Sequence, residues 1–85
     1  MPKLIFTSHL GGVAPEGEST YPGETVGAVL AAAFAEHRGL QHYVLDDQGS
    51  LRKHVVIFAD GRRAALADSV AEASEIYVLQ ALSGG

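Results

Sequence analysis

Three stretches of the chain carry the apolar and β-favouring residues that are typical of strands. The first, residues 3–10, alternates apolar side chains between two faces. Residues 55–59 and 76–82 are almost wholly apolar, which is the pattern of strands buried in the middle of a sheet. The short polar stretch 18–21 is expected to return beside the first strand, at an edge of the same sheet.

One stripe of apolar side chains at helical spacing predicts a single long helix. Its members are Val26, Val29, Leu30, Ala33, Phe34 and His37. Thr25 directly precedes the stripe and is a candidate N-cap, while Gly39 is expected to terminate the helix. The helix therefore has one apolar face, which it has to bury against another element.

The remaining segments are interpreted as turns, short strands and a linker. Residues 46–50 and 60–61 have turn composition, and the second of these turns predicts a hairpin into residues 62–64. Residues 43–45 are interpreted as a short strand. Residues 65–74 are interpreted as a linker with the composition for one helical turn.

The order of these elements predicts an α+β fold of the β-grasp (ubiquitin-like) type. We expect a mixed sheet of four to five strands, one main helix, and a last strand that lies in the middle of the sheet, parallel to the first. The 85 residues are sufficient for one domain. The predicted organisation is a single domain over residues 1–85, with residues 83–85 as a flexible C-terminal tail.

The two strongest strands carry more apolar side chains than one helix can cover. Both 55–59 and 76–82 are apolar on both faces, so one face is expected to be exposed and to dock a partner protein. The candidate docking residues on that face are Val56, Phe58, Tyr77 and Leu79. In the alternative interpretation, the loops 11–15 and 40–43 fold over this face.

Composition excludes several classes of function. Six Lys and Arg against ten Asp and Glu give a net charge of -4, which argues against nucleic acid and membrane partners. The absence of cysteine excludes disulfides, thiolate-bound metals and a cysteine nucleophile. The four histidines lack the spacing of a metal motif, so no metal site is predicted. Ser8 and Ser69 lack the flanking glycines of a hydrolase nucleophile turn. A cytoplasmic protein is expected, because no signal peptide or membrane span is present.

The C-terminal residues are the chemically distinctive part of the chain. Leu82 and Ser83 lead into Gly84 and Gly85, and glycine has the widest backbone freedom of any residue. Three extended residues span about 10 Å, so the carboxylate of Gly85 is expected to reach into a narrow channel that larger residues would not enter. Gly85 is therefore the candidate reacting residue, with the three preceding residues as its stem.

The helix start 25–30, the strand 54–58 and above all the segment 78–85 resemble the MoaD/ThiS family of ubiquitin-like sulfur carriers. The layout is most similar to the CysO-type carriers. Two stretches depart from the family pattern. Residues 73–75 replace an acidic Gly-Asp turn, and residues 80–82 lack the prolines that commonly precede the two glycines.

The resemblance implies a carrier that partner enzymes act upon. An E1-like adenylating enzyme would use ATP to activate Gly85, a sulfur donor enzyme would convert it to a thiocarboxylate, and a biosynthetic enzyme would accept the sulfur for cysteine, thiamin, molybdopterin or a similar metabolite. The carrier itself would not be an enzyme and would bind no cofactor. Two alternatives stay open: a ubiquitin-like modifier conjugated through Gly85, and a noncatalytic MoaD-like subunit of a partner enzyme.

Overall fold

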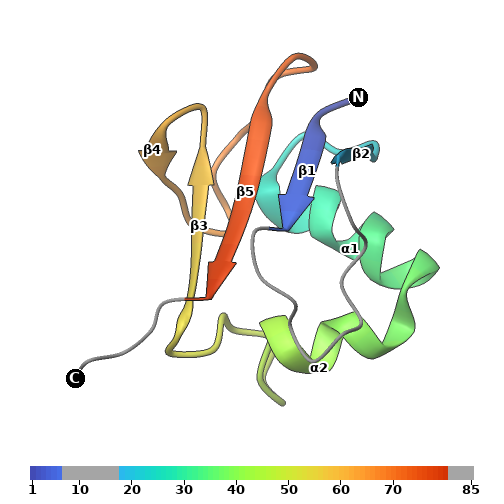
Figure 1. Cartoon of the computed structure of the whole chain (residues 1–85), viewed down its shortest axis with the longest axis vertical. Coiled ribbons are helices and arrows are strands. Elements are labelled where there is room, and N and C mark those ends of the chain that lie inside the picture. Colours follow the sequence, from blue (N-terminus) through green and yellow to red (C-terminus); the bar gives the residue numbers. More distant parts are fainter. Residues whose placement is uncertain (7–17, 81–85) are drawn as a thin grey trace.

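The computed structural model describes residues 1–6 and 18–80, which form one five-stranded sheet with helices on one side (Figure 1). The elements are β1 (Lys3–Phe6), β2 (Glu18–Thr20), α1 (Val26–Glu36), the 3₁₀ turn η2 (Arg38–Leu40), α2 (Gln41–Val44), β3 (Val55–Ala59), β4 (Arg62–Arg63) and β5 (Glu75–Gln80). The predicted strand residues 7–10, the loop 11–15 and the tail 81–85 lie outside the described residues.

The strand order β2-β1-β5-β3-β4 confirms the predicted β-grasp topology. β5 lies in the centre of the sheet, where it pairs parallel to β1 and antiparallel to β3. The polar strand β2 lies at one edge, as its composition predicted, and the two-residue strand β4 lies at the other. Figure 1 shows β1 and β5 running in the same direction, which requires a crossover connection through α1.

Helix α1 begins where the sequence predicted and ends differently. The Thr25 hydroxyl accepts a hydrogen bond from the Ala28 backbone N–H at 3.1 Å, which confirms the N-cap. The prediction that Gly39 terminates the helix was wrong, because His37 is the C-cap and residues 38–40 tighten into the 3₁₀ turn η2. This turn carries Leu40 into the core, where it is 0% exposed.

The predicted strand at residues 43–45 was also wrong, because Tyr43 and Val44 lie in α2 and Leu45 is its C-cap. Leu40 and Val44 are four residues apart, so a helical turn directs both side chains to the same side. Both are fully buried in the core. Burial of this pair accounts for the helical conformation, and Leu45 then leaves α2 to form an isolated bridge with Leu51.

The segment 64–70 follows the start of α1 without forming a helix of its own. The carbonyl oxygens of Asp68 and Leu66 accept hydrogen bonds from the backbone N–H groups of Val26 and Gly27, at 3.0 and 2.8 Å. The first turn of a helix has N–H groups without intrahelical acceptors. The linker therefore caps α1 through its backbone.

The hairpin between β3 and β4 is tied to the start of β5 through Asp60. Asp60 (φ 53°) and Gly61 (φ 81°) adopt the left-handed conformations of a two-residue hairpin turn. The Asp60 carboxylate accepts the Glu75 backbone N–H at 3.0 Å and the Ser74 hydroxyl at 2.8 Å. These two hydrogen bonds lower the pKa of Asp60, and the one from the Glu75 backbone N–H has the larger effect. The contacts fix β5 beside β3 in a single register.

The core lies between α1, η2, α2 and the helix-facing side of the sheet. Five of the six residues in the predicted helical stripe belong to it, and only His37 does not. The other core residues are Leu4, Phe6, Tyr21, Leu40, Val44, Val55, Ile57, Ile76 and Val78. Tyr21 is 5% exposed although it was assigned to a polar edge stretch. Burial, and then the nearby Glu36 carboxylate, raise the pKa of the Tyr21 phenol. Among the described residues, no helix is long and apolar enough to cross a membrane.

Candidate functional site

The strands β3 and β5 separate their side chains between two faces of the sheet. Val55, Ile57, Ile76 and Val78 point towards the helices and are buried. Val56, Phe58, Tyr77 and Leu79 point to the opposite, outer face, where each is partly exposed. The predicted alternation is therefore confirmed, and the four candidate docking residues share one face.

Strand register brings these four side chains into contact distance of one another. Val56 lies opposite Leu79, and Phe58 lies opposite Tyr77, in the antiparallel β3–β5 pair. Side chains of directly opposed residues are neighbours on the same face. The four candidates thus form one continuous apolar surface across the two central strands.

A fifth member of this surface was not among the sequence candidates. Ile5 on β1 lies beside Tyr77 in the parallel β1–β5 pair and is partly exposed. The alternation of β1, which places Leu4 and Phe6 in the core, was the available signal. We call Ile5, Val56, Phe58, Tyr77 and Leu79 the outer-face patch.

Charged side chains border the outer-face patch at both edges of the sheet. Arg63 on β4 lies opposite Phe58, and Glu18 on β2 lies opposite Ile5. The register therefore forms one row across all five strands: Glu18, Ile5, Tyr77, Phe58, Arg63. Lys3 reaches Glu18 with 3.9 Å between Nζ and Oε1, so the basic side of the patch is the β4 edge.

The tyrosine in the patch has a fixed polar end. The Tyr77 hydroxyl donates to Oε1 of Glu75 at 3.4 Å, two residues earlier on the same face of β5. Its ring forms part of the outer-face patch, between Phe58 and Ile5. An aromatic ring with a satisfied hydroxyl is a common component of protein interfaces.

The loop 40–43 does not cover the outer-face patch. Leu40 belongs to the core on the helix side of the sheet, and Tyr43 is 43% exposed. That part of the alternative interpretation is wrong. The other proposed cover, residues 11–15, lies outside the described residues.

The predicted reacting tail follows directly from the strand that carries the patch. β5 ends at Gln80, which pairs with Val55 at the beginning of β3. The candidate residues Leu82, Ser83, Gly84 and Gly85 lie outside the described residues. Within residues 1–6 and 18–80, no three histidine, aspartate or glutamate side chains come close enough together to hold a metal ion.

Comparison with known proteins places this architecture among small carriers and modifiers. No family model matches the chain. It is 34% identical over 61 residues to small archaeal modifier protein 1 of Haloferax volcanii, an alignment that covers 72% of this chain and 70% of that protein. The crystal structure of SAMP1 from Haloferax volcanii superposes with a TM-score of 0.81 at 29% identity, covering 99% of this chain and 98% of that one.

A bacterial structure shares the same fold at lower identity. A chain of the crystal structure of the Amycolatopsis orientalis BexX/CysO complex superposes with a TM-score of 0.81 at 17% identity and covers 100% of both chains. The central parallel pair of strands, with one long helix on one face, defines a ubiquitin-like β-grasp protein. Within this class, the chain belongs to the MoaD/ThiS family of ubiquitin-like proteins, together with small archaeal modifier protein 1, and it shares its layout with CysO.

Proposed function

We propose that the protein carries sulfur as a thiocarboxylate on Gly85. In the first step, an E1-like partner transfers AMP from ATP to the Gly85 carboxylate and releases pyrophosphate. In the second step, sulfide or an enzyme persulfide attacks the acyl carbon, AMP leaves, and reductive release of any mixed disulfide by a thiol yields the thiocarboxylate. In a third enzyme the thiocarboxylate sulfur attacks an electrophilic small-molecule precursor and displaces its leaving group, and water then hydrolyses the acyl–sulfur bond, which releases the sulfur with the product and regenerates the carboxylate.

The position of β5 is the observation that supports this role most directly. β5 is hydrogen-bonded on both sides, to β1 and to β3, and its side chains Ile76 and Val78 are fully buried. A terminal segment that leaves such a strand starts from a fixed point. The residues after Gln80 would therefore extend from a rigid base, which limits the volume that Gly85 has to search before it reaches a partner's active site.

The outer-face patch supplies the docking surface in this proposal. Its aromatic and aliphatic side chains lie on the strand that leads to Gly85, so a partner bound there would be held close to the reacting end. The patch is continuous over three strands, and exposed apolar surfaces of this kind mark interfaces more often than they mark simple surface residues. The chain's own contribution is binding and orientation, with ATP bound by the partner.

Mass spectrometry of the intact protein tests the carrier proposal. The protein is purified from the cells in which it naturally occurs, under conditions that exclude oxidants and alkylating agents. We expect a fraction that is heavier by the difference between sulfur and oxygen, located on Gly85 by fragmentation. A chain lacking Gly85 serves as the control. Absence of the heavier form in sulfur-replete cells that express the activating enzyme would contradict the proposal.

A charge introduced into the outer-face patch tests docking separately. We expect Leu79→Glu to lower kcat/KM for adenylation by the activating enzyme at least about tenfold, because a carboxylate would have to be desolvated at the interface. Ala28→Glu, at an exposed site on α1, is the matched control and should leave the rate unchanged. Pyrophosphate release measures both. Equal rates for the two variants would exclude the outer-face patch as the docking surface.

Protein modification is a second candidate function, which the similarity to small archaeal modifier protein 1 favours. In that role, a lysine amine of a target protein would attack the adenylated or thioester-bound Gly85 and form an isopeptide bond. Immunoblots of cell extracts should then show higher-mass bands that are lost when Gly85 is deleted. Tryptic peptides with a Gly-containing remnant on lysine would identify the targets. The same activated Gly85 serves both functions, so one result does not exclude the other.

A further inference from the structure

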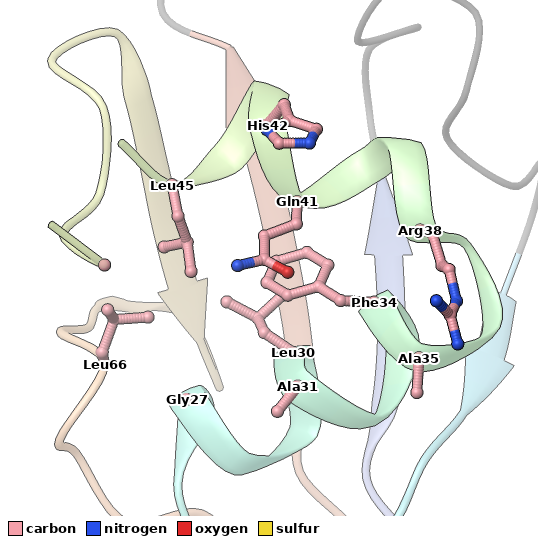
Figure 2. Close-up of a pocket in the computed structure, with 11 residues that line it drawn as sticks. Gly27, Leu30, Ala31, Phe34, Ala35, Arg38, Gln41, His42, Leu45 and Leu66 are labelled. Carbon is pink, nitrogen blue, oxygen red and sulfur yellow. The ribbon is translucent and has the colours of Figure 1, made fainter. Parts of the chain in front are cut away.

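A concave surface lies on the helix side of the molecule, across the sheet from the outer-face patch. It has a volume of about 680 Å³ and is bordered by α1, α2, Gly49 and Leu66 (Figure 2). We call it the α1–α2 hollow. Neither the carrier chemistry nor the docking of the activating enzyme accounts for it.

The floor of the α1–α2 hollow is apolar. Leu30 and Phe34 on α1 form its base, but both belong to the core and are nearly inaccessible, so they shape the hollow and offer little surface for binding. The accessible apolar lining residues are Ala31, Ala35, Leu45 and Leu66. Leu45 and Leu66 close one end from two different segments, as Figure 2 shows. The small exposed side chain of Ala31 leaves the space above α1 open.

Backbone contacts hold the apolar end of the hollow in position. The Gly27 N–H donates to the Leu66 carbonyl oxygen at 2.8 Å. A Cβ on residue 27 would lie 3.2 Å from that oxygen, so glycine permits the close approach of the Leu66 segment to α1. The Arg52 guanidinium likewise donates from Nε to the His42 carbonyl oxygen at 2.6 Å, which ties α2 to the segment before β3.

The hollow carries one positive charge, that of Arg38, in a protein that is acidic overall. Arg38, Gln41 and His42 are its polar lining residues, and none of the residues that line it is acidic. The whole chain has a net charge of -4. Figure 2 shows the Arg38 side chain beside Ala35, at the end opposite Leu66. Arg38 forms no ion pair with any carboxylate in the part of the chain that the structure describes.

The dimensions of the hollow match two turns of helix. The nine residues from Gly27 to Ala35 are separated by eight steps and rise about 12 Å along α1, which equals the length of an eight-residue helix lying alongside. An amphipathic helix places apolar side chains at i, i+3, i+4 and i+7 into such a groove. A carboxylate at the end of this stripe would meet the guanidinium of Arg38.

We propose that the α1–α2 hollow docks a short amphipathic helix of a partner protein, with apolar side chains against Ala31, Leu45 and Leu66 and a carboxylate paired with Arg38. The helical partner is favoured because the lining residues follow α1 over about two turns, with Leu45 and Leu66 at one end and the cation Arg38 at the other. The hollow and the outer-face patch lie on opposite sides of the sheet. A partner in the hollow would therefore bind while the activating enzyme occupies the outer face.

Selection of helical peptides by the full chain tests this proposal. A phage library of 14-residue helix-favouring peptides is panned against the protein, and the selected peptide is synthesised with a fluorescent label. We expect a dissociation constant below about 100 µM by anisotropy, a regime typical of short docking peptides, and an apolar i, i+3/i+4 pattern that ends in Asp or Glu. Recovery of no such peptide would overturn the proposal.

Matched variants locate the binding site. Ala31→Glu places a carboxylate in the hollow and should weaken binding at least about tenfold, or roughly 1.4 kcal/mol. Ala28→Glu, an exposed position on the same helix that does not line the hollow, should change it less than about twofold. Arg38→Gln should weaken binding of the acidic peptide about fivefold. It should not change binding of a peptide in which the terminal Asp or Glu is replaced by Gln, and this comparison isolates the predicted ion pair.

Three results would contradict the proposal and identify another occupant or site. Equal binding to the Ala31→Glu and Ala28→Glu variants would place the peptide elsewhere. Binding of sodium decanoate that is sensitive to Ala31→Glu, with no peptide selected, would indicate a small apolar acid. A dimer in sedimentation analysis that Ala31→Glu dissociates would indicate a second copy of the chain. Leu79→Glu should not affect peptide binding, which separates this test from that of the proposed function.

Discussion

The two faces of the central strands carry the same kinds of residue in different environments. On the inner face, Ile57, Ile76 and Val78 are at most 1% exposed, packed beneath α1 and α2. On the outer face, the equally apolar Val56 and Leu79 are partly exposed, although they alternate with the buried residues along the same strands. Residue type therefore does not distinguish the two faces. The difference in burial arises because α1 covers the inner face only.

This difference indicates that the two sets of side chains serve different purposes. Inner side chains stabilise the fold because they lose nearly all contact with water. Outer side chains gain much less from folding, so their apolar character adds little to stability and is available for binding. The variants below test this distinction, beginning with the largest expected effect on stability.

The largest difference is expected between Ile76→Ala and Leu79→Ala, which remove comparable side chains from the two faces of β5. Loss of the fully buried Ile76 should reduce the free energy of unfolding by about 3–4 kcal/mol, because it removes buried area and leaves a cavity. Loss of Leu79 should cost about 1 kcal/mol. Urea denaturation measures both. Equal losses would show that the outer face is as well packed as the core, which would contradict its role as a docking surface.

A smaller effect is expected when α1 loses its N-cap. Thr25→Ala removes the acceptor for the Ala28 N–H and should destabilise the protein by about 1 kcal/mol. The effect extends beyond the helix because α1 packs against the inner face of the sheet and buries it. Thr25→Ser retains the hydroxyl and is the control. If thermal unfolding did not separate the two variants, backbone contacts from the segment 64–70 would be sufficient to hold the helix start.

The smallest effect concerns Asp60, whose contacts fix the register that assigns each side chain to its face. A one-residue shift of β5 would exchange the inner and outer sets. The lowered pKa means that the folded state favours the carboxylate, so this stabilisation is present above the ordinary aspartate pKa of 3.8 and is lost as the pH falls through the lowered folded value.

Asp60→Asn should therefore be less stable than the parent protein at neutral pH, and this difference should shrink as the pH falls below 3.8. Urea midpoints measured across this range provide the comparison. Asp47→Asn, in an exposed turn, controls for the loss of one charge. A stability difference that did not change with pH would indicate that the Asn side chain perturbs the turn in some other way.

The candidate site was only partly predictable. Alternation along residues 55–59 and 76–80 was sufficient to place Val56, Phe58, Tyr77 and Leu79 on one face, because side chains of a strand alternate whatever the fold. The addition of Ile5 and the charged neighbours Arg63 and Glu18 depends on which strands pair and in what register. Those pairings join residues that are distant in the chain.

By itself, the sequence determined features that depend on neighbouring residues. These are the α1 stripe, the Thr25 cap, the Asp60-Gly61 turn and the two faces of each strand. They follow from backbone geometry over a few residues. The resemblance to a carrier family also followed from local segments, and the similarity to small archaeal modifier protein 1 confirmed it.

Tertiary structure alone decided the conformation of residues 38–45 and the existence of the α1–α2 hollow. The local pattern of residues 43–45 favoured a strand, but burial of Leu40 and Val44 together in the core required a helical turn. Burying two such side chains is worth several kcal/mol, whereas secondary-structure preferences differ by less than about 1 kcal/mol per residue. Packing between distant segments therefore outweighed local preference at this point of the chain.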